Sequence, residues 1–266
     1  MKIYCEPLMR ELELPDNIER IVSLVSGFTE TIFEMGHGER VVGVSEYCSR
    51  YVKDLRAEVV GDYLKVDLSK LKSLKPDVVL STTGVQMQLA LELSREGLPM
   101  YVLPLPKSIN GVWENVLLIG GLLNDVRSAR ELVLKWQRIF LNGRETLSER
   151  PSAYLELWLG KHVRTVGGLS FVNDLIEYAG LRNIFGDVNK GFFVPPLKEV
   201  LRRRPQLIIF FYEPDFLIDP RRIVESRGWD WDFKLIESTV EAGRNLIHDG
   251  PSMMRTIQWL REQIWG

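Results

Sequence analysis

The sequence predicts an α/β protein with two Rossmann-like lobes, whose mostly parallel sheets are joined by one long α-helix. Strand and helix patterns alternate along the 266 residues, which is typical of βαβ units. One unit occurs twice, as "LSKLKSLKPDVVLSTTG" at 68–84 and as "LKEVLRRRPQLIIFFYEPD" at 197–215. In each copy a short amphipathic helix ends at a proline and an apolar run follows, and a long helical pattern separates the copies. Two similar sheets are therefore expected.

The first lobe is expected over residues 1–124. Its first 21 residues alternate polar and apolar side chains like a strand or hairpin. We expect Thr29 and Glu30 to begin the first helix, because acids favour the positive end of the helix dipole, and Gly36 and Gly38 to end it. The expected segments are strands at 20–26, 40–47 and 100–105, helices at 27–36, 87–97 and 109–123, and the first proline-centred unit.

A single helix is expected over 125–149, as the link between the lobes. Its apolar residues recur at helical spacing without a proline, and its length is well beyond the mean helix of about 11–12 residues. Pro151 ends it. The second lobe is then expected over 150–266, with a strand at 153–159, helices at 170–180 and 252–265, and the second proline-centred unit.

Composition excludes several classes of protein. The formal net charge is −2 and the charges are interspersed, so no basic stripe is available for nucleic acid. No apolar run reaches the roughly 20 residues of a membrane span. Because no secretion signal is visible, the chain as written is expected in the cytoplasm, or outside it if a leader has been removed.

Enzyme motifs give little support for catalysis. The sequence contains no phosphate loop, dinucleotide glycine fingerprint, nucleophile elbow or zinc-protease spacing. The step "VGGLS" before a helix could hold an anion, and Glu30 and Glu46 are the carboxylates that an enzyme interpretation would use. Both acids also have simpler explanations, as a helix-start acid and as loop surface, so a binding protein without an intrinsic cofactor is favoured.

Four stretches carry a resemblance to a known family. They are "ERIVSLVSGFTETIFEMGHGERVVGVSEYCSRY", "VGDYLKVDLSKLKSLKPDVVLSTTG", "VGGLSFVNDLIEYAGLRNIFGD" and "HDGPSMMRTIQWL". In this order they resemble the class III solute-binding proteins of ABC importers, which bind vitamin B12, haem or ferric siderophores, and the cobalamin-binding branch most of all. The resemblance implies a largely pre-formed ligand cleft between two lobes, which fits the rule that α/β sheets bind ligands beyond the carboxyl ends of their strands.

The resemblance also implies which residues line the cleft. On the first lobe they are Ser26, Gly27, Phe28, Tyr47, Arg50, Tyr51, Tyr63, Thr82 and Thr83, and on the second they are Trp158, Arg164, Gly167, Gly168, Phe192, Phe193, Tyr212 and Arg244. Aromatic side chains suit a flat macrocycle. The alternative for Trp158 is the core of an apolar strand, whereas Phe192 and Phe193, next to a Pro-Pro pair, favour exposure. Arg164 and Arg244 replace an aromatic and an acid of the cobalamin pattern, so an anionic chelate competes with cobalamin.

Two further groups of residues are candidates for function: the histidines, and the positions at which relatives contact the permease. His37 is expected at solvent, and His162 and His248 are weak candidates for an axial metal or haem ligand, because no third donor has suitable spacing. Ser69 and Lys198 stand where importer-feeding relatives carry a glutamate that contacts the permease. Asp67 and Glu199 are only near neighbours, and Lys198 with Arg202, Arg203 and Arg204 predicts a basic surface.

Three hypotheses follow from these patterns. The first is a non-catalytic receptor that reversibly binds a metal chelate such as vitamin B12, haem or a ferric siderophore, with an ABC permease as its partner. The second is a cytosolic protein that handles corrinoids or tetrapyrroles without a permease. The third is a chelatase-like enzyme, which predicts turnover and a buried acid–base pair.

Overall fold

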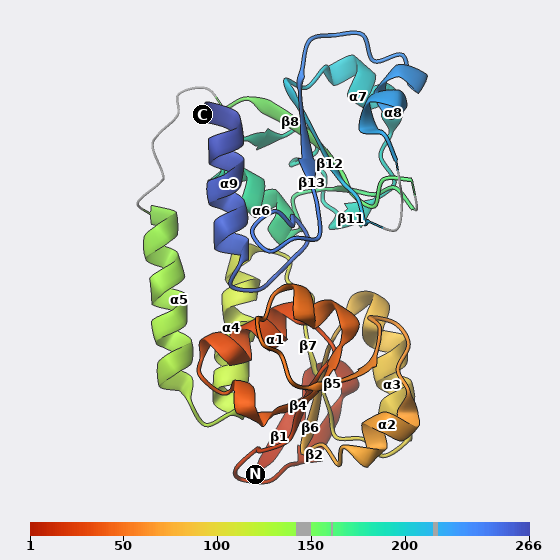
Figure 1. The fold of residues 1–266 in the computed structure, drawn as a ribbon. Coiled ribbons are helices and arrows are strands. Elements are labelled where there is room, and N and C mark those ends of the chain that lie inside the picture. The colour runs from red at the N-terminus through yellow and green to blue at the C-terminus, as the bar shows by residue number, and fades with distance from the viewer. Residues whose placement is uncertain (142–149, 161, 215–217) are drawn as a thin grey trace. The chain divides into compact units, whose positions relative to one another are not determined.

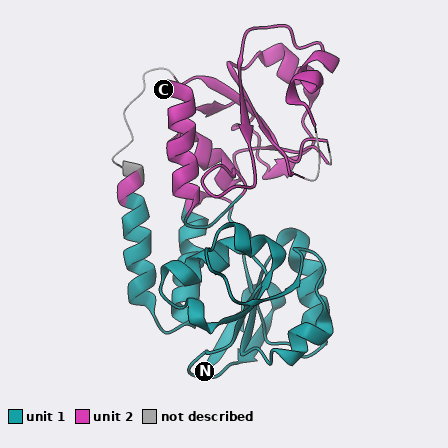
Figure 2. Cartoon of the chain, in the orientation of Figure 1, with its two compact units in different colours: residues 1–106, 110–137, 248–251 teal, residues 107–109, 138–247, 252–266 magenta. Residues whose placement is uncertain are grey.

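A computed structural model describes residues 1–141, 150–160, 162–214 and 218–266. The chain forms two compact units (Figure 2). Unit 1 contains residues 1–106, 110–137 and 248–251, and unit 2 contains residues 107–109, 138–247 and 252–266. The segment His248–Pro251 therefore belongs to unit 1, although its neighbours on both sides belong to unit 2. The expected limits 1–124, 125–149 and 150–266 stay predictions.

Unit 1 is built on a parallel sheet of five strands. Their order is β5 (Glu58–Gly61), β4 (Val41–Ser45), β3 (Ile21–Ser23), β6 (Val78–Thr82) and β7 (Met100–Leu103). The helices of this part of the chain are α1 (Ser26–Glu34), α2 (Leu68–Ser73), α3 (Met87–Arg95), α4 (Ile109–Leu122) and α5 (Val126–Leu141). An antiparallel hairpin of β1 (Lys2–Cys5) and β2 (Arg10–Glu13) precedes them, so the predicted N-terminal hairpin is confirmed.

Unit 2 repeats the parallel arrangement with four strands (Figure 1). Their order is β10 (Arg182–Asn183), β8 (Ser152–Glu156), β12 (Leu207–Phe211) and β13 (Lys234–Ser238). Its helices are α6 (Phe171–Tyr178), α7 (Leu197–Arg203), α8 (Pro220–Ser226) and α9 (Met253–Trp265). A separate antiparallel pair joins β9 (Thr165–Val166) and β11 (Phe192–Phe193). The predicted fold class, α/β with a mostly parallel sheet in each lobe, is confirmed.

The repeated proline-centred unit is present in both sheets. Pro76 follows α2 and precedes β6, and Pro205 follows α7 and precedes β12. The residue before each proline has a left-handed backbone, with φ of 44° at Lys75 and 43° at Arg204. The same left-handed turn thus ends both helices, and the proline that follows cannot continue them. Both strands that follow are central and fully buried.

The first helix begins earlier than predicted. α1 starts at Ser26, its first turn contains no acid, and Glu30 is buried inside the helix with 4% exposure. The prediction that Thr29 and Glu30 open the helix is therefore wrong. The end is as expected from the sequence, because the helix stops at Glu34 and Gly36 takes a left-handed conformation with φ of 83°.

The helix expected over 125–149 begins at Val126 and is described as far as Leu141. Residues 142–149 lie outside the described residues. Asp125 precedes the first turn, where its Oδ1 accepts the Ser128 backbone N–H at 3.0 Å and its Oδ2 lies 2.8 Å from His37 Nε2. His37 is half-buried in this contact, so the prediction that it faces solvent is wrong.

We expect Asp125→Ala to destabilise unit 1 by about 1 kcal/mol, the usual cost of losing a helix N-cap. Hydrogen bonds from Ser128 and His37 lower the pKa of Asp125 from 3.8 to about 2. Because the folded pKa is depressed, this stabilisation is complete above pH about 4 and is lost as the pH falls through about 2. Thermal unfolding at pH 7, 3 and 2 tests this, with the exposed Glu131→Ala on the same helix as the control. A loss that is equal at all three pH values would contradict the role of the ionised carboxylate.

Candidate functional site

The first candidate surface lies on a loop of unit 2 that follows β8. Leu157 and Arg164 exchange two backbone hydrogen bonds of 2.7 and 3.1 Å, which close the hairpin that begins at Trp158. The Leu159 N–H donates to the Phe211 carbonyl at 3.0 Å. This bond fixes the loop to the carboxyl end of β12, the end of a parallel strand at which α/β sheets bind ligands.

Trp158 occupies the first position of this loop. Its φ of 53° is left-handed, which is a strained conformation for a bulky residue. The indole is half-buried and meets Phe211 edge-on at 6.3 Å, while the His162 ring stacks on it at 5.7 Å and 24°, and Phe192 lies at 6.0 Å. The residue thus lies just past the strand and not in its core. We call Trp158, His162, Phe192 and Phe211 the aromatic cluster.

Phe192 and Phe193 point in different directions, as successive strand residues do. Phe192 contacts Trp158, whereas Phe193 meets Phe185 edge-on at 5.7 Å and packs against the buried core of unit 2. Both are half-buried. The structure therefore separates two residues that the sequence grouped together: Phe192 belongs to the aromatic cluster and Phe193 to the core.

The remaining predicted contacts on unit 2 are polar. The Tyr212 hydroxyl donates to Glu237 at 2.6 Å, and this bond, with burial, raises the pKa of Tyr212 to about 12. Arg164 Nη1 donates to the Val163 carbonyl at 2.9 Å, and Arg244 is exposed with Glu241 at 3.8 Å. Arg164 therefore borders the aromatic cluster through the hairpin, while no contact in the described part of the chain joins Arg244 to it.

Gly167 and Gly168 do not form an anion cradle. The Gly167 N–H donates to the Gly191 carbonyl and the Gly168 N–H to the Val188 carbonyl, both at 2.9 Å. A side chain at either glycine would clash with backbone carbonyls of residues 186–190. The "VGGLS" step therefore requires glycine for the close approach of two chain segments, and the interpretation that it could hold an anion is wrong.

The second candidate surface surrounds His248 in unit 1. His248 Nε2 lies 2.7 Å from Glu30 Oε2, and its Nδ1 lies 3.3 Å from Ser26 Oγ. An N–H at Nε2 donates to the Glu30 carboxylate, and the Ser26 hydroxyl is the hydrogen-bond partner of Nδ1. Tyr51 stacks on the imidazole at 3.7 Å and 6°. We call Ser26, Glu30, Tyr51 and His248 the His248 cluster.

Close packing continues on both sides of the His248 cluster. A Cβ at Gly27 would clash with Asp249 and lie 3.0 Å from Gly250 N, so only glycine lets the segment 248–251 approach α1. Burial raises the pKa of Asp249, and burial together with the Asp249 charge raises the pKa of Tyr63. Ser26, Gly27, Tyr51 and Tyr63, all predicted from the sequence, are thus brought together here.

Other predicted positions of unit 1 lie elsewhere. Phe28 and Thr82 are 2% and 1% exposed, and the Thr82 hydroxyl donates to the Leu103 carbonyl at 3.2 Å. The rim position predicted for both is therefore wrong. The Thr83 hydroxyl accepts the Leu105 N–H at 2.8 Å. The Arg50 guanidinium is exposed and lies 4.9 Å over the Tyr47 ring.

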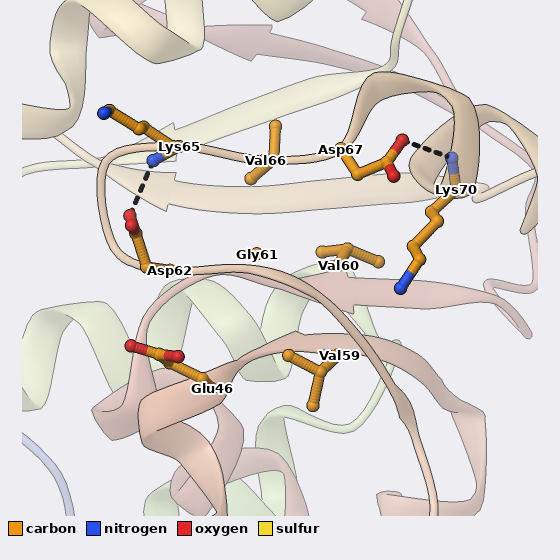
Figure 3. Close-up of a pocket in the computed structure, with 9 residues that line it drawn as sticks. All are labelled: Glu46, Val59, Val60, Gly61, Asp62, Lys65, Val66, Asp67 and Lys70. Atoms are coloured by element: carbon orange, nitrogen blue, oxygen red, sulfur yellow. Dashed lines mark hydrogen bonds between the residues drawn. The ribbon is translucent and has the colours of Figure 1, made fainter.

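A hollow of about 390 Å³ lies at the carboxyl ends of β4 and β5 (Figure 3). Its charged residues are Glu46, Asp62, Lys65, Asp67 and Lys70. Two of the carboxylates are turned to backbone amides, Asp62 to Lys65 and Asp67 to Lys70. Since the charges are mixed and these two acids already accept hydrogen bonds, the hollow is a weak candidate for a binding site.

The two altered docking positions are exposed on α2 and α7. Asp67 caps α2 by accepting the Ser69 and Lys70 backbone N–H groups. Next to Lys198, Glu199 accepts from Arg202 at 2.5 and 2.8 Å and from Arg203 at 2.6 Å. The neighbouring acids are therefore used within their own units, and the surface around Lys198 is less positive than the arginine run predicted.

Neither a cluster of metal-binding side chains nor a helix that could span a membrane occurs among the described residues. In the described ranges no group of three or more His, Cys, Asp or Glu side chains could hold a metal ion, and Cys5 and Cys48 are buried and free. Within the same ranges, no helix combines the length and the apolarity that a bilayer crossing requires. The sequence did not predict the Glu30–His248 contact, which joins residues 218 positions apart.

Comparison with known proteins extends these observations. The chain is 28% identical over 206 residues to the cobalamin-binding protein of Halobacterium salinarum, covering 74% of this chain and 55% of that protein. It is 26% identical over 200 residues to YvrC of Bacillus subtilis, an uncharacterized ABC transporter substrate-binding lipoprotein, covering 72% and 63%. The chain thus spans little more than half of the first relative's length.

Solved structures show the same fold. The periplasmic haem-binding protein HutB of Vibrio cholerae superposes with a TM-score of 0.78 at 15% identity, over 93% of this chain and all but 1% of that one. The family model described as "Periplasmic binding protein" matches residues 21–225, which include both parallel sheets except β13. The chain belongs to the periplasmic binding protein family.

Proposed function

We propose that this protein is a receptor that reversibly binds a metal chelate, such as a corrinoid, haem or a ferric siderophore, without turnover. The observation that carries the proposal is the aromatic cluster, in which a strained and half-buried Trp158 is placed at the carboxyl end of a parallel strand. Family membership and the similarity to a cobalamin-binding protein and to a haem-binding protein support the same class of ligand.

A titration of the purified protein with cyanocobalamin, haem and a ferric siderophore tests the proposal. We expect saturable quenching of tryptophan fluorescence by one of them at micromolar concentration or below. Visible absorbance of the chelate provides a second signal that does not depend on tryptophan. The absence of binding to all three would overturn the proposal.

Phe192→Ala should weaken binding of the chelate about tenfold, or about 1.4 kcal/mol, because the phenyl ring supplies apolar contact area next to Trp158. The exposed aromatic Tyr4, on β1 of unit 1, provides the matched control as Tyr4→Ala. Equal affinities of Phe192→Ala and Tyr4→Ala would remove Phe192 from the site. Circular dichroism of both variants checks that the fold is retained.

A chelatase-like enzyme is the second candidate, and one observation favours it. The buried contact of the Glu30 carboxylate with the His248 imidazole, at 2.7 Å, supports this hypothesis, which predicts a buried acid–base pair. Incubation of the protein with metal-free protoporphyrin IX and Fe²⁺ or Co²⁺, followed by absorbance, tests it. Metal insertion that is lost in Glu30→Gln would favour the enzyme over the receptor.

We further propose that any ABC permease that binds this protein does so without the glutamate pair. Similarity to YvrC, an ABC transporter substrate-binding lipoprotein of Bacillus subtilis, supports such a partner. Ser69 and Lys198 stand at the two docking positions and both are exposed. Binding to a candidate permease should therefore survive Ser69→Ala and Lys198→Ala, and a loss in either variant would show that the altered positions still make contact.

A further inference from the structure

We propose that His162 supplies the axial ligand to the metal of a bound planar chelate. This inference rests on the proposed function, because it concerns the same surface of unit 2. It assigns one donor atom, an imidazole nitrogen, and one class of ligand: a metal macrocycle with at least one exchangeable axial position.

The other two histidines are already engaged. The His248 ring is 2% exposed, with Nε2 bonded to Glu30 and Nδ1 next to the Ser26 hydroxyl. His37 Nε2 lies 2.8 Å from the Asp125 carboxylate. His162 is exposed, and no hydrogen bond of its imidazole occurs in the described part of the chain. Among the three, it is the histidine that can bind a metal without breaking an existing contact.

The loop holds the imidazole in a defined position. Its backbone N–H donates to the Trp158 carbonyl at 3.3 Å, and its ring stacks on the Trp158 indole at 5.7 Å. Stacking covers a face of the ring, whereas the nitrogen lone pair lies in the plane of the ring, so the stack leaves coordination open. Trp158, on which the imidazole stacks, has a strained left-handed backbone, and such strain is characteristic of functional sites.

The number of donors determines the class of ligand. In the described residues no three metal-binding side chains gather, so a free metal ion would lack the donors that a site needs. A macrocycle brings four equatorial donors of its own and needs one from the protein. Neutral imidazole is the usual nitrogen donor to iron, and the haem iron of many proteins is held by a single histidine. Phe192, at 6.0 Å from Trp158, provides apolar contact beside the imidazole.

The test compares ferric haem with metal-free protoporphyrin IX on the whole chain, for the native protein and for His162→Phe. Phenylalanine keeps a flat ring for the stack and removes both nitrogens. We expect the native protein to bind haem at least tenfold more tightly than the metal-free macrocycle, with a Soret band shifted to that of a nitrogen-ligated haem. His162→Phe should lose both the shift and the tenfold preference, while its affinity for the metal-free macrocycle stays within twofold of native.

Two further variants make the result specific. His162→Ala with added imidazole should regain the shifted Soret band, whereas a purely structural role of His162 would not be rescued by free imidazole. Tyr4→Ala should behave like the native protein. Haem binding with an unchanged spectrum and affinity in His162→Phe would overturn the axial role and leave the receptor function intact. If the native protein binds neither macrocycle, both the axial role and the receptor function for planar chelates are overturned.

Discussion

Replacing Arg227 by methionine should destabilise unit 2 by about 3–5 kcal/mol, the cost of breaking a buried ion pair from one side. Arg227 ends α8 and reaches Glu156 at the end of β8, with Nη1 to Oε2 at 2.6 Å and Nη2 to Oε1 at 2.7 Å. The Glu156 side chain is 0% exposed and that of Arg227 is 16% exposed. Removal of the guanidinium leaves a fully buried carboxylate without its counter-charge.

The other hydrogen-bond partner of Glu156 cannot replace the positive charge of Arg227. The Tyr154 hydroxyl donates to Oε2 at 2.6 Å, and burial, with the Glu156 charge, raises the pKa of Tyr154 well above its usual range. Tyr154 therefore remains a neutral donor and cannot replace the guanidinium charge. Arg227 also lies 4.9 Å over the Trp229 ring, so its loss removes a cation–π contact as well.

Urea unfolding, monitored by far-ultraviolet circular dichroism, measures the lost free energy of unfolding from the transition of unit 2. Arg222→Met on the same helix is the matched control, because Arg222 is 85% exposed, and its effect should stay within about 0.5 kcal/mol. The double variant Glu156→Gln with Arg227→Met removes both charges and keeps an acceptor for Tyr154. It should recover at least half of the stability lost in Arg227→Met. A single variant that unfolds like Arg222→Met would show that the carboxylate is not held as a buried anion.

The central strands of both sheets were predictable from sequence, because burial on both faces leaves an uninterrupted apolar run. β6 and β12 are buried at every residue and follow a proline, so local pattern was sufficient. Among the strands of the two parallel sheets, the sequence did not reveal β5, β10 and β13, which form three of the four sheet edges. In β13, "KLIES", only two of five residues are buried, so its pattern resembles a loop.

The candidate site was predictable only in part, and for a similar reason. Resemblance grouped Trp158 with Phe192, and the two rings lie 6.0 Å apart in the structure, while their contact with a ligand stays a prediction. It could not show that Phe193 turns to the core, since that depends on the two-residue strand β11. The Glu30–His248 contact joins residues 218 positions apart, and no periodicity in a single sequence reports such a pair.

That contact supports the second large prediction. His248→Phe keeps a flat ring to stack on Tyr51, but it removes the imidazole that Glu30 and Ser26 contact. Glu30 is 4% exposed, so the loss of this hydrogen-bond donor should destabilise unit 1 by about 2–3 kcal/mol, because hydrogen bonds to charged groups contribute more than neutral ones. The control is Glu34→Gln, an acid of the same helix whose side chain is 42% exposed.

The position of His248 in the chain makes the result more informative than a stability value alone. Residues 248–251 belong to unit 1, whereas the residues before and after them belong to unit 2. The His248 imidazole therefore attaches this short segment to Glu30, which lies 218 positions earlier in the sequence. Hydrogen exchange measured by mass spectrometry should therefore rise in peptides that contain residues 248–251 and at the start of α1 in His248→Phe, and should stay at the native rate in Glu34→Gln. A double-mutant cycle with Glu30→Gln should give a coupling energy of at least about 1 kcal/mol, since residues in direct contact are not additive. Native exchange rates in His248→Phe would mean that close packing at Gly27 alone retains the segment, and that the buried acid–base pair has a purpose other than anchoring.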